Sequence, residues 1–467
     1  MTAQFGMIGL GTMGRNLVLN MADKGFSVSG YDRNPDQQKR LAEEGAGKQV
    51  QAVASMQELV NSLETPRRIM MLVPAGKIVD AVIDEISPLL QPGDILIDGG
   101  NSHFTDTDKR IERLKSTGIH FTGMGVSGGE DGARLGPSMM PGGSQDGYAE
   151  LKNILEKIAA QTSDGPCVTY IGSGSAGHYT KMVHNGIEYA IMQLISEVYA
   201  VLKNIGGLNN AALQKTFAGW NKTELQSFLV EITATVLAKK DDETGEPLVD
   251  MILDKAKQKG TGMWTSQTAM DLNVPLTIID AAVSMRYISS MKEDRVAVAK
   301  KYSHPAITTA TDKEQLLSTC KNALHFGFLL SYAQGLQLLS VASTTFNYGI
   351  NIAEVIRIWK GGCIIRSVLL NDLQKAYVED TALTNIIQSP VFQQTLQSLR
   401  SDVVSLVTTA TASGIPAAAL SASLQYFDAY CSAQLPANLI QAQRDYFGAH
   451  TYERTDKQGI FHTNWEG

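Results

Sequence analysis

The chain has 467 residues, more than one ordinary hydrophobic core accommodates, so we expect two or three domains. Hydrophobic residues make up 43% and charged residues 19%, a balance typical of soluble globular proteins, and the formal net charge is −7. Nothing in this charge indicates a nucleic-acid or anionic-membrane partner, and no apolar run is long enough to span a bilayer.

The N-terminus and the cysteines predict a cytoplasmic protein. The first residues lead directly into a strand-like segment, without the basic and apolar regions of a secretory leader. The cysteines are widely spaced, at Cys167, Cys320, Cys363 and Cys431. They form no CxxC pair and no spacing suited to zinc, so we expect reduced thiols and no metal site.

Residues 1–176 alternate between short apolar runs and helical patterns. The expected strands are residues 4–8, 26–31, 68–73, 95–98, 120–124 and 167–171. This alternation predicts βαβ units with a mostly parallel sheet, that is, an α/β Rossmann-like domain. Ligands of such sheets bind beyond the carboxyl ends of the strands, which is where the glycine-rich segments of this chain fall.

Gly9, Gly11 and Gly14 form a GxGxxG pattern between the first expected strand and the first helix. The pattern alone is a weak signal in a glycine-rich chain, but its position makes it specific. Here the backbone amides can face a pyrophosphate at the N-terminus of the helix. The pattern therefore predicts a dinucleotide-binding domain.

The second expected strand ends at Asp32, Arg33 and Asn34, about 20 residues further on. An acidic residue here suits the 2′-hydroxyl of NAD, whereas an arginine suits the 2′-phosphate of NADP. Asp32 would repel a phosphate, and Arg33 could pair with it. These residues leave the choice of cofactor open, and a plain polar turn is the alternative interpretation.

Beyond Gly177 the pattern becomes helical, with expected helices at about 177–204, 210–221, 224–238, 274–290, 313–342 and 352–359. We therefore predict a dinucleotide-binding domain over residues 1–176 and an all-helical substrate and dimerisation domain over 177–435. Residues 436–467 form a C-terminal tail that is rich in aromatic residues and lacks a clear period. Its composition favours docking on another surface over disorder.

The first helix of the second half carries four polar groups. At ~100° per residue, Lys181 and Glu188 lie ~20° apart, with His184 and Asn185 within ~60° of Lys181. A lysine and a glutamate on one face of a mostly apolar helix are costly to bury without a function. The row predicts an acid–base site, and a solvated polar stripe is the alternative.

Five segments resemble the decarboxylating 6-phosphogluconate dehydrogenases: IDGGNS at 97–102, GVSGGE at 125–130, KMVHNGIEY at 181–189, KGTGMW at 259–264 and AQRDYFGAHTY at 442–452. The resemblance covers essentially the whole chain. It implies oxidative decarboxylation of 6-phosphogluconate to ribulose 5-phosphate, a reaction of the pentose phosphate pathway, with NADP as cofactor. It also implies a homodimer in which each tail contributes to the neighbouring subunit's site.

The resemblance further implies residue roles. Lys181 is expected to take the proton of the 3-hydroxyl and then to polarise the ketone, and Glu188 to protonate C1 of the enediol. The expected cofactor-binding residues are Gly9, Gly11, Thr12, Met13, Gly14, Asp32, Arg33, Asn34, Val73, Ala75 and Asn101. The expected substrate-binding residues are Asn101, Ser127, Gly128, Gly129, His184, Asn185, Tyr189, Lys259, Thr261 and Arg286, with Arg444 and His450 supplied by the neighbouring tail.

Two positions depart from the family pattern. Asp32 stands where asparagine is common, and Pro74 where many members carry a lysine. The aspartate adds a negative charge, the proline removes a positive one near the cofactor, and both leave NAD open beside NADP. Two other functions are considered. The length of 467 residues argues against another, usually shorter, β-hydroxyacid dehydrogenase. The presence of Lys181 and Glu188 argues against an inactive dinucleotide sensor.

Overall fold

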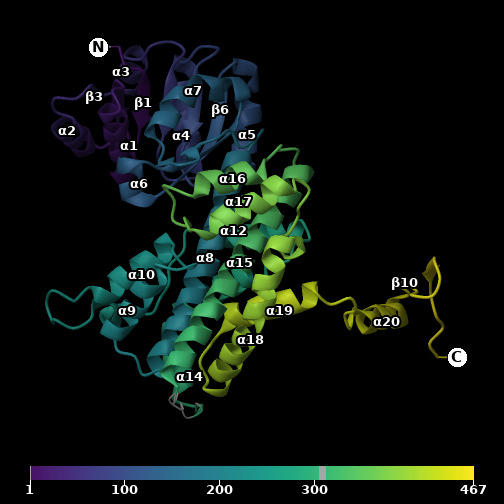
Figure 1. Ribbon diagram of the computed structural model, residues 1–467. Coiled ribbons are helices and arrows are strands. Elements are labelled where there is room, and N and C mark those ends of the chain that lie inside the picture. Colours follow the sequence, from purple (N-terminus) through teal and green to yellow (C-terminus); the bar gives the residue numbers. More distant parts are fainter. Residues whose placement is uncertain (1, 304, 306–311, 467) are drawn as a thin grey trace. The chain divides into compact units, whose positions relative to one another are not determined.

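The computed structural model describes residues 2–303, 305 and 312–466. The chain folds as two compact units that divide between Ser423 and Leu424. The first unit contains a β-sheet with its flanking helices and a large helical part, and the second unit is formed by the C-terminal segment (Figure 1).

The sheet of the first unit has seven strands in the order β3-β2-β1-β4-β5-β6-β7. They are β1 (Phe5–Ile8), β2 (Val28–Tyr31), β3 (Val50–Ala52), β4 (Arg68–Met71), β5 (Ile95–Asp98), β6 (His120–Ser127) and β7 (Ser138–Gly143). Strands β1 to β6 are parallel, and β7 pairs with β6 antiparallel. The predicted α/β class is confirmed, and the strand order reverses between β1 and β4.

Helices cover both faces of this sheet, which explains its continuous apolar strands. The helices are α1 (Thr12–Asp23), α2 (Pro35–Glu44), α3 (Met56–Asn61), α4 (Lys77–Ile86), α5 (Phe104–Leu114), α6 (Gly129–Leu135) and α7 (Gln145–Ile158), with short 3₁₀ turns η1 (Ser87–Leu89) and η2 (Lys115–Thr117). Successive strand residues alternate between two cores. Met7 packs in the core that includes residues of α1 and α7, and Ile8 in the core that includes residues of α3 and α4.

The strand expected at 167–171 is absent, and this prediction was wrong. The segment follows the edge of β7, and single bonds run from the Met139 N–H to the Cys167 carbonyl and from the Ile171 N–H to the Pro141 carbonyl. Pro141 has no N–H to donate between them, so a continuous ladder does not form. Two short strands, β8 (Gln161–Thr162) and β9 (Gly165–Pro166), form a separate hairpin just before this segment.

The rest of the first unit is helical, as predicted. Its helices are α8 (Ala176–Asn204), α9 (Asn210–Trp220), α10 (Phe228–Ala238), α11 (Leu248–Met251), α12 (Thr261–Asp271), α13 (Thr277–Ser290), α14 (Lys292–Ala299), α15 (Lys313–Thr345), α16 (Ile352–Trp359), α17 (Leu369–Glu379), η3 (Ile386–Gln388), α18 (Pro390–Ala412) and the start of α19 (Ala418–Tyr430). The long helices α8 and α15 pack along each other at the centre (Figure 1). Helix α10 begins later than expected because the Ser227 side chain caps it.

Helix α8 meets the sheet through glycine. A Cβ atom on Gly177 would lie 2.2 Å from the carbonyl oxygens of both Gly123 and Met140. Only glycine therefore allows the first turn of α8 to rest on β6 and β7. This contact explains the glycine-rich run before the helix, and it places the following turns of α8 beside the carboxyl end of the sheet.

The second unit is a small module of α20 (Ala437–Gly448) and a hairpin of β10 (Tyr452–Glu453) and β11 (Ile460–Phe461). Asp445 is its buried centre and accepts hydrogen bonds from the N–H groups of Thr451, Thr463 and the Trp465 ring. Burial raises the pKa of Asp445, but these bonds and His462 outweigh it and lower the pKa to about 2. The tail thus has regular secondary structure, although its sequence shows no clear hydrophobic periodicity.

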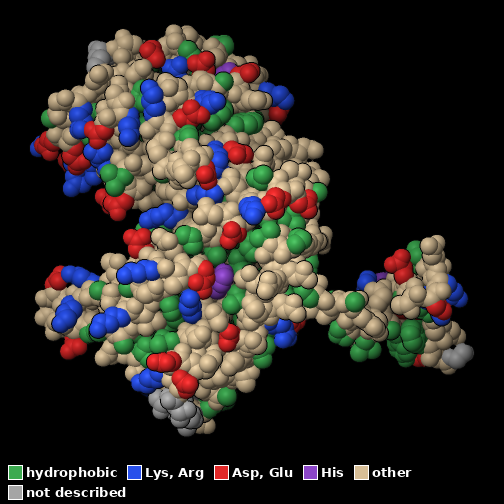
Figure 2. Space-filling model, in the orientation of Figure 1, with side chains coloured by type: hydrophobic (Ala, Val, Ile, Leu, Met, Phe, Trp, Pro, Cys, Tyr) green, Lys and Arg blue, Asp and Glu red, His purple; other side chains and the backbone are tan. Residues whose placement is uncertain are grey.

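In the described part of the chain, every helix is too short or too polar to cross a membrane. Acidic and basic side chains are interspersed over the face of the first unit drawn in Figure 2. All four cysteines are free thiols.

Candidate active site

The polar row of α8 is buried. Lys181 is 6% exposed and His184 0%, and the Glu188 side chain is 22% exposed. Burial excludes the alternative of a solvated stripe and fits the prediction of an acid–base site.

One hydrogen-bonded chain joins this row to two other segments. The Ser127 hydroxyl, at the end of β6, lies 3.1 Å from His184 Nε2, and His184 Nδ1 lies 3.1 Å from the Asn185 side-chain oxygen. The Asn185 amide donates to the Thr261 hydroxyl at the start of α12 over 3.2 Å. Since the Asn185 oxygen faces His184, the ring carries its proton on Nδ1, and Nε2 accepts from Ser127.

The two ionisable groups at the ends of the row meet at the same imidazole. Lys181 Nζ lies 3.4 Å from His184 Nδ1, and a Glu188 carboxyl oxygen lies 4.0 Å from that nitrogen. The Lys181 stem is fixed by close packing, because a Cβ atom on Gly125 would lie 2.3 Å from the Lys181 Cβ. Gly125 on β6 therefore has to lack a side chain for the lysine to reach this place.

Burial shifts all three groups towards their neutral forms. Burial lowers the pKa of Lys181, although the charge of Glu188 raises it in part. Burial raises the pKa of Glu188, and the charge of Lys181 opposes that shift. The pKa of His184 is held well below its usual value by burial and by Lys181. A partly neutral lysine can take a proton, and a protonated glutamate can give one.

A second group lies further along α8. Tyr189 is buried, and the Arg286 guanidinium stacks over its ring at 3.5 Å from the ring centre. A Cβ atom on Gly262 would lie 2.4 Å from the Tyr189 ring, so the start of α12 passes directly beside it. Lys259, just before α12, is exposed. A buried aromatic hydroxyl, a stacked arginine and a nearby free lysine are groups that bind a phosphate.

The expected dinucleotide pocket lies where the strand order reverses. A cavity of about 280 Å³ is lined by Ile8, Gly9, Gly11, Tyr31, Asp32, Arg33, Met56, Leu72, Val73, Pro74, Ile78 and Val82. A Cβ atom on Gly14 would lie 1.9 Å from the Gly9 carbonyl oxygen, whereas the space around Gly11 is open. No side chain caps α1 at Gly11, so the amides around Thr12 and Met13 face this open space. These features fit a dinucleotide.

The turn after β2 is arranged differently from the simplest expectation. The Asp32 carboxylate accepts from the Leu10 N–H at 2.7 Å and from the Asn34 N–H at 2.8 Å, so it fixes the glycine-rich turn. Arg33 is exposed and pairs with Glu85 on α4 at 2.7 Å. The arginine thus lines the cavity paired with Glu85 and not with Asp32.

Remaining candidates lie at the same edge of the sheet or in the second unit. Ala75 and Asn101 are exposed in the loops after β4 and β5. Gly128 and Gly129 follow β6 with positive φ angles, and a Cβ atom on Gly128 would lie 2.5 Å from the Gly362 carbonyl oxygen. In the second unit, Arg444 and His450 are exposed; Arg444 donates to the Gln441 side chain, and the His450 ring lies 5.8 Å from that of Phe447.

Three parts of the site were missed from the sequence. The Trp359 ring packs edge-on against His184 at 5.7 Å, and the Ile364 N–H bonds the Ser127 hydroxyl at 3.4 Å. Glu85 partners Arg33. The Gly361-Gly362 pair could have indicated that the backbone there packs closely against another segment. Trp359 and Glu85 are single residues outside any motif, so nothing in the sequence indicated that they belong to the site.

Comparisons with known proteins agree with this geometry. Residues 4–172 match the model of the NAD binding domain of 6-phosphogluconate dehydrogenase, and residues 177–465 match that of the C-terminal domain of 6-phosphogluconate dehydrogenase. A decarboxylating 6-phosphogluconate dehydrogenase of Synechococcus elongatus is 51% identical, and an NADP(+)-dependent one of Bacillus subtilis is 50% identical, each over 99% of both chains. The chain is also similar to a solved structure, that of Plasmodium falciparum 6-phosphogluconate dehydrogenase, described in apo form, with its cofactor NADP+ and with its substrate 6-phosphogluconate. The two chains are 44% identical, the TM-score is 0.96, and the match covers 99% of this chain and 100% of that one.

Proposed function

The chain belongs to the 6-phosphogluconate dehydrogenase family, and on that premise we propose that it converts 6-phospho-D-gluconate to D-ribulose 5-phosphate and CO₂ while reducing NADP. The observation that carries this proposal is the buried group of Lys181, His184 and Glu188, in a chain whose parallel sheet also forms a dinucleotide pocket. The high identity over the full chain favours this activity over that of a shorter β-hydroxyacid dehydrogenase or a sensor.

In the oxidation step, the neutral amine of Lys181 takes the proton of the 3-hydroxyl while the C3 hydrogen leaves as hydride. NADP, when bound, accepts that hydride. The amides of Gly11, Thr12 and Met13 would hold the pyrophosphate, and Arg33 the 2′-phosphate. Burial supplies the neutral lysine that this step needs, since a lysine in water is almost fully protonated at neutral pH.

In the decarboxylation step, the Lys181 ammonium donates a hydrogen bond to the new C3 ketone. The bond between C1 and C2 breaks, CO₂ leaves, and the bonding electrons form an enediol whose oxygen takes the proton from Lys181. Glu188 then protonates the carbon that lost CO₂, and the enediol hydroxyl returns its proton to Lys181 as the ketone reforms. The raised pKa of Glu188 favours the protonated form that this step requires.

We assign the substrate's two ends to the two groups of side chains. The carboxylate and hydroxyls would be held by the segment after β6 and by α8, that is, by Asn101, Ser127, Gly128, Gly129, His184 and Asn185. The phosphate would be held by Tyr189, Lys259, Thr261 and Arg286. The support is the order along α8, where the stacked Tyr189–Arg286 pair follows the acid–base row.

We also propose a homodimer in which the tail of each chain completes the neighbour's site with Arg444 and His450. The exposed apolar residues Leu439, Ile440 and Phe447 on α20 support docking of the tail on another surface. The division into residues 1–176, 177–435 and 436–467 stays our proposal, and the two family matches, which meet between 172 and 177, support its first boundary. The widely spaced free thiols support a cytoplasmic location.

Arg33 and Glu85 should control the preference for NADP. Replacing Arg33 with alanine should weaken NADP binding about 10–150-fold, the effect of losing a charge-assisted bond of about 1.5–3 kcal/mol, and leave NAD nearly unchanged. Glu85→Gln should act in the opposite direction, because it frees Arg33 from its ion pair and removes a negative charge that opposes the phosphate. Titration of cofactor fluorescence with NADPH and NADH measures both ratios. Equal effects on the two cofactors would show that this turn does not bind the 2′-phosphate.

The dependence of turnover on pH should be bell-shaped. Activity should rise as Lys181 loses its proton, at a pH lowered by burial, and fall as Glu188 loses its proton, at a pH raised by burial. His184 stays neutral throughout because its pKa lies well below the usual value. Glu188→Gln should slow turnover and remove the alkaline limb from the kcat profile. If that limb persists in the variant, another group supplies the final proton.

Initial-rate kinetics test the proposed function. Purified protein is assayed with 6-phosphogluconate against NADP and NAD in parallel, and with 3-hydroxyisobutyrate as the competing substrate class. We expect a kcat/KM for 6-phosphogluconate with NADP that exceeds every other combination by orders of magnitude. Turnover of the shorter hydroxyacid with similar efficiency would contradict the assignment.

A further inference from the structure

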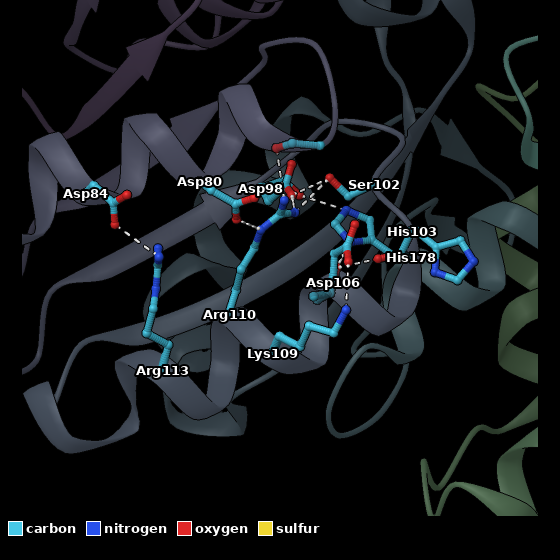
Figure 3. Close-up of polar contacts among 12 residues, drawn as sticks. Asp80, Asp84, Asp98, Ser102, His103, Asp106, Lys109, Arg110, Arg113 and His178 are labelled. Carbon is cyan, nitrogen blue, oxygen red and sulfur yellow. Dashed lines mark hydrogen bonds and ion pairs between the residues drawn. The ribbon is translucent and has the colours of Figure 1, made fainter.

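A buried arginine ties together two loops at the carboxyl edge of the sheet. Arg110 on α5 is only 2% exposed, and its guanidinium is fully engaged (Figure 3). Its Nε donates to Asp80 on α4 at 2.7 Å, and one terminal nitrogen donates to Asp98 at the end of β5 at 3.1 Å. The other terminal nitrogen donates to the Gly76 carbonyl at 3.1 Å. One side chain thus fixes the loop after β4 and the end of β5 at the same time.

Asp98 extends this network into the loop that carries Asn101. One carboxylate oxygen accepts from the Gly100 N–H at 3.0 Å, and the other accepts from the Ser102 hydroxyl at 2.6 Å. Arg110 also donates to the Ser102 oxygen at 3.2 Å. Asn101 lies between these two fixed residues and is itself exposed. Its backbone is therefore held on both sides while its side chain faces solvent.

The same network reaches the helix that carries Lys181. His178 is buried, and its Nε2 donates to the Asp98 carbonyl at 3.0 Å while its Nδ1 accepts from the Thr107 hydroxyl at 2.7 Å (Figure 3). His178 lies three residues before Lys181, on the same side of α8. The position of Lys181 along the sheet edge is thereby linked to Asp98 and, through it, to Arg110.

The location of these loops gives the network a role in the reaction. A dinucleotide on this sheet extends across the point where the strand order reverses. The end of β2, at Arg33, receives the adenosine half, so the nicotinamide half must lie beyond β4 and β5. The two loops that Arg110 joins, residues 73–76 and 99–102, follow those strands. They are the segments that would set the distance from the nicotinamide to C3 of the substrate.

We propose that Arg110 is a positioning residue for hydride transfer, which acts by fixing the loops at 73–76 and 99–102 relative to Lys181. The proposal rests on the proposed function. Arg110 itself touches neither substrate nor cofactor, and it acts through Gly76, Asp98 and Ser102. Hydride transfer is highly sensitive to such positioning, because a displacement of about 1 Å can cost about 10²-fold in rate.

The test is single-turnover kinetics on the purified full-length enzyme, with NADP-saturated protein in excess over 6-phosphogluconate. At a saturating excess of enzyme, the rate constant reports the geometry of hydride transfer, and a separate fluorescence titration with NADPH gives the fraction of folded, competent enzyme. Arg110→Met should lower the rate constant about 10²-fold. Arg110→Lys keeps the charge but places its donors on one nitrogen instead of a planar fork of three, so it cannot reach all four partners; its rate constant should fall between those of Arg110→Met and the parent. Arg113→Met is the matched control, because Arg113 lies on the same helix but pairs with Asp84 at the surface; its rate constant should stay within about twofold.

Loss of one partner of a buried ion pair destabilises a fold strongly, so Arg110→Met could fail to accumulate. Ser102→Ala serves in that case, since it keeps the Arg110–Asp98 pair and the Gly100–Asp98 bond and removes the two bonds of the Ser102 hydroxyl, to Asp98 and from Arg110. It should also lower the rate constant, by several-fold. A reduced fraction of competent enzyme with an unchanged rate constant in these variants would overturn the proposal and leave Arg110 a purely structural role. An inactive parent enzyme would instead refute the proposed function.

Discussion

Replacing Lys181 with methionine should lower turnover by about 10²–10⁴-fold, the usual cost of losing a general base. Methionine keeps the length and apolar stem that pack against Gly125, so the fold should be retained. The change removes only the amine that faces His184 at 3.4 Å. NADPH binding, measured by fluorescence titration, should not change, because no residue of α8 lines the dinucleotide cavity, which is formed by strands, the loops that follow them, α3 and α4.

The control for this variant is Lys152→Met, at an exposed lysine of α7 whose ion pair with Glu156 is 3.8 Å long. Its turnover should equal that of the parent. Near-normal turnover in Lys181→Met would remove this lysine from the mechanism and leave the buried row of α8 without its base. Loss of both turnover and NADPH binding would point to a disturbed fold rather than to lost chemistry.

Mixing two inactive chains should restore activity if each tail completes the neighbouring site. In a dimer of one Lys181→Met chain and one Arg444→Ala chain, one site carries both defects and the other carries neither. The intact site should give up to about half of the parent activity, whereas either homodimer should be severely impaired. Dual-tag purification of the mixed dimer, followed by steady-state assays, measures this directly.

Deleting residues 436–467 provides an independent check. It should raise the KM for 6-phosphogluconate strongly, because the arginine–phosphate contact is lost, and leave the Kd for NADPH unchanged. A point variant distinguishes the effect of Arg444 from that of the rest of the tail. Arg444→Lys keeps the charge and should recover part of the affinity for 6-phosphogluconate that the deletion loses. No activity in a verified mixed dimer would show that Arg444 acts within its own subunit or not at all.

Local patterns predicted much of the fold. The alternation of strands and helices gave the parallel sheet, and the period of 3.6 residues placed Lys181, His184 and Glu188 on one face of α8. Both patterns depend on residues within a few positions of one another, so they can be recognised in a single sequence. The comparisons confirm the family. A relative named as NADP(+)-dependent and decarboxylating supports the proposed reaction and cofactor. The roles of single site residues stay predictions.

Features that depend on contacts between residues far apart in the sequence could not be predicted. Arg110 bonds residues that are 8 to 34 positions away, and His178 reaches Asp98 across 80 positions. The buried Asp445 organises the tail through bonds up to 20 positions away. The strand expected at 167–171 failed because of a proline on its partner strand, not within the segment itself. Asp32 lines the expected cofactor cavity, but the bond from its carboxylate to the Leu10 N–H, which fixes the glycine-rich turn, was not predicted. In each case the residue that determines the structure lies too far along the sequence to be found from the local pattern.

The most direct test of the central claim is the stoichiometry of the products. The enzyme is incubated with excess NADP and limiting 6-phosphogluconate that is isotopically labelled at C1. NADPH is measured by absorbance, labelled CO₂ by trapping, and the sugar phosphate by chromatography. The account predicts that NADPH, labelled CO₂ and ribulose 5-phosphate form in equal amounts, and that Lys181→Met forms none of them at a comparable rate. Formation of NADPH with the label retained in the organic product would contradict it, because the enzyme would then oxidise its substrate without decarboxylation.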